Sequence, residues 1–212
     1  KRINIGNVAI GDTSPIAIQS MTNTDTHDKS ATLCQILSLQ REGCDIVRIT
    51  VPDIEAVSTI PYLKENGVAI PIVADIHFDY KIALACAEAG VDKIRINPGN
   101  IGSDDRVHAV VKACRAAGIP IRIGVNSGSL EKEILAKHGS PTPEALAESA
   151  LYHASLLEKY DFDDIVISLN NFIGSCRFSR AGGTGQQNVH ILAVNYFARC
   201  FAQPSFKISF TF

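Results

Sequence analysis

The sequence predicts an α/β fold, a (β/α)8 TIM-type barrel in which about six βα units are recognisable. Short β-rich runs alternate with longer helical patterns, and glycine follows several of the helical patterns, as is common at helix ends. This alternation indicates a parallel sheet with helices packed outside it. An open doubly wound sheet is the alternative, but no G-x-G-x-x-G follows the first strand, which disfavours a dinucleotide-binding sheet.

Six strands are expected where short runs are rich in β-branched residues and begin after turn signals. They cover residues 15–20, 45–51, 71–77, 93–97, 120–126 and 164–169. Five helices are expected between them, at residues 28–42, 54–66, 80–89, 104–117 and 143–159. Because a closed barrel of this class has eight strands, we expect an incomplete barrel.

Composition and charge are those of an ordinary globular protein. Of the 212 residues, 46 % are hydrophobic and 20 % are charged, and the formal net charge is −2. The sequence contains no basic stripe of the kind that would indicate a nucleic-acid partner. It also contains no run of about 18 apolar residues, which a membrane span would need. The sequence starts at Lys1 rather than Met and lacks the apolar stretch of a signal peptide, so we expect a chain that begins inside a longer reading frame.

Six cysteines are spread along the chain without any C-x-x-C. The first four lie in or beside helical patterns, where cysteine behaves as a small hydrophobe. Their spacing favours neither a disulfide framework nor a metal site. We therefore expect free thiols and a location in the reducing cytoplasm.

The last segment departs from the βα pattern. All 22 acidic residues precede residue 171, whereas seven of the nine phenylalanines follow it. So abrupt a change predicts a boundary at Asn170 or Asn171, between a partial barrel (residues 1–170) and a tail (residues 171–212). Because about 40 residues without a disulfide or metal would be marginal as a domain, we interpret the tail as unrelated or frame-shifted sequence.

Polar side chains share one face of every predicted strand near its C-terminal end. Side chains alternate between the faces of a strand, so Arg48 and Thr50 face away from Val47 and Ile49. Active sites of TIM barrels lie at the C-terminal ends of the strands. Met21 is expected in a loop on that side. The candidate binding residues are Arg48, Asp75, His77, Arg95, Asn97, Arg122 and Asn126.

The chemistry that these residues indicate is anion binding. Arginine presents a planar fork that suits phosphate and carboxylate groups. Three arginines aimed at one pocket repel one another unless a multiply charged anion lies between them, so a diphosphate fits better than a single carboxylate. The alternative is a set of structural ion pairs, with Asp75, Asp45 and Asp92 as the acids. No catalytic residue is assigned, and no metal ligand is predicted.

Five segments carry a resemblance to a known family. They are QSMTNTDT, DIVRITVP, VADIHFDY, KIRINPGNIG and IPIRIGVNSGSLE. In this order and spacing, over about residues 2–169, the chain resembles the 4-hydroxy-3-methylbut-2-enyl diphosphate synthases of the non-mevalonate isoprenoid pathway, in their shorter bacterial form.

The resemblance implies an oxidoreductase of isoprenoid biosynthesis. Its N-terminal barrel would bind the diphosphate of 2-C-methyl-D-erythritol 2,4-cyclodiphosphate through Arg48, Arg95, Arg122 and Asn126, with Asp75 and His77 as neighbouring contacts. A separate C-terminal domain would carry a 4Fe-4S cluster held by three Cys and a Glu. Ferredoxin or flavodoxin would supply two electrons, and a homodimer would bring the cluster of one subunit to the barrel of the other.

The chain also departs from the family pattern. Asn170 stands where a diphosphate-binding lysine is expected, and Cys176 and Cys200 do not resemble the cysteine motifs of the cluster domain. We therefore expect a truncated barrel that binds the diphosphate and is inactive alone. The alternatives are a pterin-binding barrel transferase of the dihydropteroate synthase kind and a non-catalytic anion-binding module.

Overall fold

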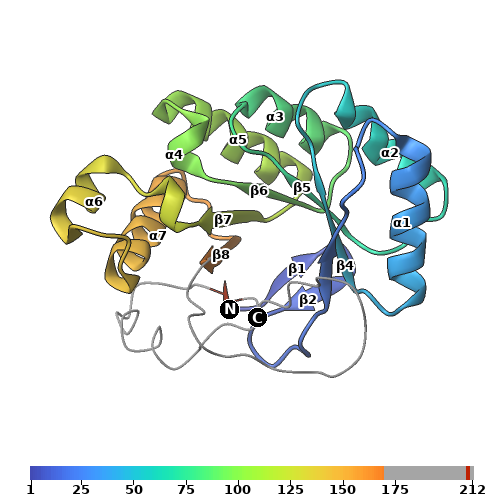
Figure 1. Cartoon of the computed structure of the whole chain (residues 1–212), viewed down its shortest axis with the longest axis horizontal. Helices are drawn as coiled ribbons and strands as arrows, with labels where there is room; N and C mark the ends of the chain where they lie inside the picture. Colours follow the sequence, from blue (N-terminus) through green and yellow to red (C-terminus); the bar gives the residue numbers. More distant parts are fainter. Residues whose placement is uncertain (170–208, 211–212) are drawn as a thin grey trace.

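The computed structural model describes residues 1–169 and 209–210, and its centre is a curled parallel sheet (Figure 1). Within the described residues the strands follow one another around the sheet in chain order, with β3 and β9 at its edges. They are β3 (Gln19–Met21), β4 (Ile46–Thr50), β5 (Ile72–Asp75), β6 (Lys93–Ile96), β7 (Ile121–Val125), β8 (Ile165–Leu169) and β9 (Ser209–Phe210). This is part of a TIM-type barrel, so the predicted fold class is confirmed.

Helices cover the outer, convex side of the sheet (Figure 1). The helices of the described residues are α1 (Lys29–Arg41), η1 (Ala56–Ser58), α2 (Thr59–Glu65), α3 (Tyr80–Glu88), α4 (Pro98–Ile101), α5 (Asp104–Ala117), η2 (Ser127–Ser129), α6 (Lys132–His138) and α7 (Pro143–Glu158), of which α6 lies beyond α7, apart from the sheet. The five predicted helices are confirmed, except that the second divides into η1 and α2. The short helices α4 and α6 were not predicted. In the described part of the chain, no helix has the length and apolar character needed to cross a membrane.

Local sequence signals set the helix ends. The Asp28 carboxylate accepts a hydrogen bond from the Ala31 N–H at 2.9 Å and so caps the start of α1. The Thr142 hydroxyl caps α7 in the same way. Gly118 ends α5 in the left-handed conformation, with φ of 66°, which glycine adopts without steric cost.

One strand prediction was partly wrong. Of residues 15–20 only the last two belong to β3. The neighbouring strand β4 begins at Ile46, which pairs with Gln19, so the residues before Gln19 have no strand partner in β4. Ile16 and Ile18 consequently lie outside the ladder and are 78 % and 62 % exposed.

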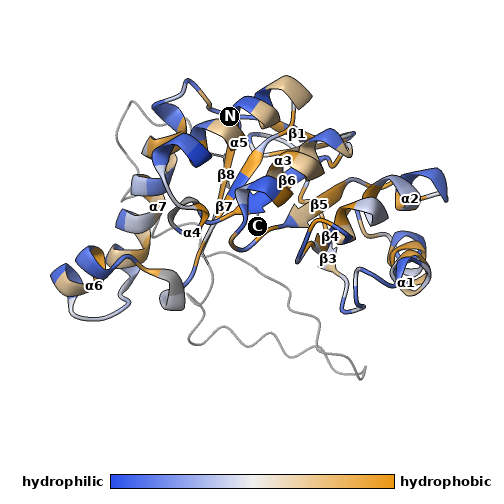
Figure 2. Ribbon diagram, turned by 90° about the horizontal axis from the view of Figure 1, so that it is seen from above, coloured by the Kyte–Doolittle hydropathy of each residue, from blue (hydrophilic) through white to orange (hydrophobic). Residues whose placement is uncertain are grey.

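The main core lies between the sheet and the helices. Strand residues of one parity, such as Ile49, Ile94 and Ile123, are fully buried there. Each such side chain contributes about 1.5–3 kcal/mol when it leaves water. Figure 2 shows the hydrophobic colours along the strands and the hydrophilic colours on the outward faces of the helices. The apolar parity therefore faces the helices, and the other parity faces the barrel interior.

A hairpin that the sequence did not predict closes the N-terminal end of that interior. It consists of β1 (Ile3–Ile5) and β2 (Val8–Ile10), which pair antiparallel. Its apolar side chains pack against the first inward-facing residues of β4, β5 and β8. We call this set the apolar plug: Ile3, Ile5, Ile10, Ile46, Val73 and Val166.

Candidate functional site

Four charged side chains from adjacent strands meet on the inner face of the curled sheet. The register places Asp75 of β5 beside Arg95 of β6, and Arg95 beside Arg122 of β7. Arg48 of β4 pairs with Val73 and so lies one step nearer the apolar plug. Asp75, Arg95 and Arg122 are at most 9 % exposed. We call Arg48, Asp75, Arg95 and Arg122 the arginine cluster.

The Asp75 carboxylate joins two of the three arginines. Its Oδ1 accepts a hydrogen bond from Arg95 Nη1 at 2.9 Å, and its Oδ2 lies 3.5 Å from Arg48 Nε. Arg48 also directs Nε and Nη2 at the sulfur of Met21, at 3.2 and 2.9 Å. The ion pairing considered for Asp75 is therefore present, but two guanidinium groups share the one carboxylate.

Arg122 has a neutral partner. Its Nε donates to Ser168 Oγ at 2.9 Å, and no ion pair among the described residues includes it. Burial, followed by the charges of Arg48 and Arg95, lowers the pKa of Arg122 to about 10. The guanidinium is still protonated at neutral pH. The arginine cluster thus holds three positive charges, two of them buried and that of Arg48 partly exposed, against one negative charge.

Arg95 occupies space that a side chain at Gly124 would take. A Cβ on Gly124 would lie 2.4 Å from Arg95 Nε and 2.6 Å from Nη2, closer than Cβ contacts normally come. Gly124 follows Arg122 on the same face of β7. The missing side chain at Gly124 lets Arg95 lie flat across β7 while it remains paired with Asp75.

The other predicted residues lie beyond the arginine cluster, at the C-terminal ends of the strands. Asn97 follows β6 and is 4 % exposed. Asn126 follows β7, is half-buried, and accepts a hydrogen bond on Oδ1 from the Gly128 N–H at 3.0 Å. His77 is exposed, with its ring 6.1 Å from that of Phe78. The structure therefore leaves His77 outside the buried cluster.

The two other acids considered as arginine partners act elsewhere. Asp45 accepts a hydrogen bond from the Ile18 N–H at 2.7 Å and holds the chain that enters β3. Asp92 contacts Lys64 Nζ at 3.0 Å and accepts from the Ile72 N–H at 2.8 Å. Neither neutralises the arginine cluster.

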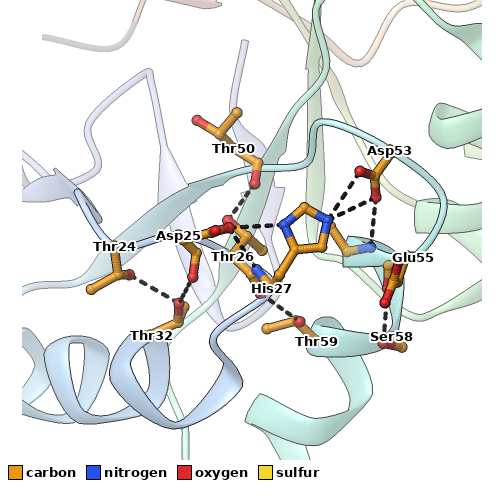
Figure 3. Close-up of polar contacts among 11 residues, drawn as sticks. Thr24, Asp25, Thr26, His27, Thr32, Thr50, Asp53, Glu55, Ser58 and Thr59 are labelled. Atoms are coloured by element: carbon orange, nitrogen blue, oxygen red, sulfur yellow. Dashed lines mark hydrogen bonds and ion pairs between the residues drawn. The ribbon is translucent and has the colours of Figure 1, made fainter.

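The loops after β3 and β4 are joined at the rim of the barrel (Figure 3). The imidazole of His27 contacts the carboxylates of Asp25 at 2.8 Å and Asp53 at 3.0 Å. The Thr26 hydroxyl donates to the Thr50 carbonyl at 2.6 Å. Hydrogen bonds to Asp25 and Asp53 raise the pKa of His27. Residues 24–27 (TDTH) thus link the loop after β3 to the loop after β4.

Residues 1–173 match the family model described as the GcpE TIM-barrel domain. The match covers more than half of the chain. This chain belongs to the GcpE family.

Curated relatives of this GcpE chain are named 4-hydroxy-3-methylbut-2-en-1-yl diphosphate synthase (flavodoxin). One from Pseudoalteromonas translucida is 58 % identical over 168 residues, covering 79 % of this chain and 45 % of the relative. One from Azotobacter vinelandii is 52 % identical over 194 residues, covering 90 % of this chain and 52 % of the relative. The chain spans about half the length of the curated relatives it matches.

Solved structures support the barrel fold of the GcpE chain. A dihydropteroate synthase from Xanthomonas albilineans has a TM-score of 0.56 at 17 % identity, covering 82 % of this chain and 66 % of that chain. A truncated 3-deoxy-D-arabino-heptulosonate 7-phosphate synthase from Thermotoga maritima has a TM-score of 0.57 at 15 % identity, covering 79 % of this chain and 56 % of that chain. At these identities the likeness concerns the fold alone.

The predicted boundary at Asn170 or Asn171 lies outside the described residues, as do Cys176 and Cys200. Of the predicted tail only Ser209–Phe210 is described, as strand β9 beside β8. The Azotobacter vinelandii match covers 90 % of the chain, so it reaches beyond residue 173. The division into barrel and unrelated tail stays a prediction.

Sequence reasoning missed three residues around the arginine cluster. Met21 lies in β3 rather than in a loop, and pairs with Arg48 in register. The Ser168 hydroxyl accepts a hydrogen bond from Arg122, a contact across strands that was not predicted. Lys93 shares the face of Arg95 and is fully buried, although it was not among the predicted site residues. The alternation of side chains was the available signal for Ser168 and Lys93.

The described residues do not fit an iron–sulfur cluster of the kind that the resemblance implies. No group of three His, Cys, Asp or Glu side chains in residues 1–169 and 209–210 is placed to hold a metal ion. Cys44, Cys86 and Cys114 are buried free thiols, and burial raises the pKa of Cys86 and Cys114 to about 12. Such thiols are poor sources of the thiolate that a metal requires.

Proposed function

We propose that this chain is the substrate-binding barrel of a 4-hydroxy-3-methylbut-2-en-1-yl diphosphate synthase. In this proposal the arginine cluster binds the diphosphate of 2-C-methyl-D-erythritol 2,4-cyclodiphosphate. The observation that carries it is the charge imbalance: the buried guanidinium groups of Arg95 and Arg122 and the partly exposed one of Arg48 are accompanied by one carboxylate, that of Asp75. The family match and the printed name of the relatives support the same conclusion.

The charge imbalance has a direct energetic meaning. Buried charges of one sign destabilise a fold unless a counter-charge is present. A cyclic diphosphate carries two negative charges on adjacent phosphate groups, which would compensate the two uncompensated guanidinium groups. Arginine binds such groups through paired N–H donors. The Arg122 guanidinium suits this contact because a neutral hydroxyl, not an acid, holds it in place.

The chain's own part in the reaction would be to bind and orient the substrate. The apolar plug below the arginine cluster excludes water from that side, which strengthens each charge–charge contact. Asn97 and Asn126, at the ends of β6 and β7, would add neutral hydrogen bonds to the same ligand. Ring opening requires two electrons, and the flavodoxin in the relatives' name is the proposed source. The electron-transfer step lies outside the described residues.

Calorimetric titration of the cyclodiphosphate into the 212-residue chain tests this proposal. Arg122→Ala and Arg95→Ala should each weaken binding by about 1.5–3 kcal/mol, the value of a hydrogen bond to a charged group. Arg122→Ala is the cleaner variant because it leaves no carboxylate unpaired. Arg41→Ala is the matched control, since that exposed arginine ends α1 and contacts the Leu37 carbonyl.

An unchanged dissociation constant in both cluster variants would remove these arginines from the site. Binding of a pterin but not of the cyclodiphosphate would favour the transferase alternative. The support for that alternative is the shared fold alone. Anaerobic reconstitution with iron and sulfide, followed by turnover with a chemical reductant, separates a binding barrel from a complete enzyme. We expect no product from this chain alone, because its described residues hold no cluster ligands.

A further inference from the structure

Lys93 is a buried amine between the apolar plug and the arginine cluster. It is the first residue of β6 and lies on the same inward face as Arg95, two residues further on. Its Cα pairs with Val73, a member of the apolar plug. The side chain is 0 % exposed, and Nζ has no hydrogen-bond partner among the described residues. A buried ammonium group without a partner is very costly.

The groups that face Lys93 do not supply a counter-charge. On the neighbouring strands the inward-facing charged groups are those of the arginine cluster, and the carboxylate of Asp75 is already in contact with Arg95 and Arg48. The inward residues Met21, Val166 and Ser168 and the hairpin side chains of the apolar plug carry no charge. In the described part of the chain, no ion pair includes Lys93.

This environment favours a neutral amine. Burial, and then the positive charges of Arg122 and Arg48, lower the pKa of Lys93 far below its ordinary value. In register, Val73 of β5 lies between Arg48 of β4 and Lys93 of β6. A diphosphate bound among the guanidinium groups would offset their positive charge and so raise the pKa of Lys93.

We propose that Lys93 is a fourth cation of the arginine cluster, uncharged in the free protein and protonated when a diphosphate is bound. Binding would then take up one proton from solvent, which the Nζ lone pair accepts. This inference rests on the proposed function, because the diphosphate supplies the negative charge. In this proposal Lys93 positions the ligand and changes its own charge when the ligand binds. The three arginines cannot change charge in this way, because arginine stays protonated throughout.

Calorimetry in two buffers tests the proton uptake. The cyclodiphosphate is a cyclic diester, so its two charges do not change near neutral pH and any proton taken up enters the protein. Titrations at one pH in buffers of low and high ionisation enthalpy should differ by the heat of up to one proton per molecule bound. Between the free and bound pKa values of Lys93, the affinity should fall tenfold for each unit that the pH rises.

Two variants assign the proton to Lys93. Lys93→Met keeps the length of the side chain without the amine, and should bind more weakly with no difference between buffers. Lys93→Arg keeps a permanent charge, so it should also lose the difference between buffers. Lys112→Met is the control, because Lys112 is exposed on α5, and it should behave as the parent chain does. Urea denaturation checks that each variant folds.

The outcomes separate this inference from the function on which it rests. Equal heats in both buffers, with the cyclodiphosphate bound, would overturn the role of Lys93 and leave the proposed function intact. That result would mean that Lys93 keeps one protonation state whether or not the ligand is bound. Proton uptake that persists in Lys93→Met would place the proton elsewhere and also overturn the inference. If the parent chain does not bind the cyclodiphosphate, both proposals fail.

Discussion

The two ends of the barrel interior are built from the same strands and the same side-chain parity, yet they differ completely in chemistry. At the N-terminal end the inward residues form the apolar plug with the β1–β2 hairpin. At the C-terminal end the next inward residues form the arginine cluster. In β5 the change occurs within one repeat, from Val73 to Asp75.

In the proposed function, this difference separates stability from binding. The apolar plug stabilises the fold by removing hydrocarbon surface from water. The arginine cluster costs stability, because its positive charges are buried in excess. In the proposed function this cost is offset by a bound anion, and the apolar surroundings strengthen the attraction between the guanidinium groups and that anion. Lys93 lies at the junction of the two regions.

The largest expected effect comes from breaking the apolar plug. Ile5→Ala removes a fully buried side chain of the hairpin and leaves a cavity, so the free energy of unfolding should fall by about 2–5 kcal/mol. Urea denaturation measures this loss. Affinity for the cyclodiphosphate should change less than stability does, because Ile5 makes no proposed contact with the ligand. Ile16→Ala is the control, since Ile16 is 78 % exposed and should change stability by less than about 0.5 kcal/mol. Equal losses in the two variants would contradict a role of the plug.

A smaller effect is expected from crowding the arginine cluster. Gly124→Ala places a methyl group 2.4 Å from Arg95 Nε, so the guanidinium must move and its pairing with Asp75 must weaken. The cost in stability should be about 1–3 kcal/mol, with a loss of about tenfold in cyclodiphosphate affinity.

The control for this variant is Gly128→Ala. A Cβ at Gly128 meets only Asn126 Oδ1, at 3.5 Å, which is an ordinary contact. Both properties should remain unchanged in the control, by urea denaturation and calorimetry. Full affinity in Gly124→Ala would show that the position of Arg95 seen in the structure is not needed for binding.

The smallest effect concerns the rim above the arginine cluster. The pKa of His27 is raised in the folded protein, so its imidazolium contributes stability that is fully present below the unfolded pKa of about 6.5. That stability is lost as the pH rises through the higher folded pKa. Since Asp25 and Asp53 have lowered pKa values, they stay charged over this window. The Tm should fall by less than about 3 °C across the transition.

His27→Gln should remove this pH dependence, because glutamine bridges the two loops without a charge. Thermal unfolding at several pH values above and below the His27 transition provides the measurement. His77→Gln is the control, since His77 is exposed outside the buried cluster and should leave the pH profile unchanged. A parent chain whose Tm is flat over this range would contradict the role of the His27 bridge.

Much of the fold and part of the site followed from periodicity in the sequence. The period-two alternation predicted that Arg48, Arg95 and Arg122 share a face with Asp75, and the structure brings these four together. The hairpin was not predicted, because two strands of three residues each carry too few alternating positions to be recognised. Asp75 was considered as a partner of one arginine, but its contact with two arginines and the contact of Ser168 with Arg122 were not predicted, since contacts across strands depend on register.

By itself the sequence determined which residues face inward and in what order they follow along each strand, because alternation and βα order are local properties of the chain. Only the tertiary structure decided which inward charges touch. In the structure, Asp75 contacts two arginines and Ser168 contacts the third. Lys93 Nζ has no hydrogen-bond partner in the described residues. The physical reason is that charge compensation depends on distance and burial, which strand register and the closing hairpin set together.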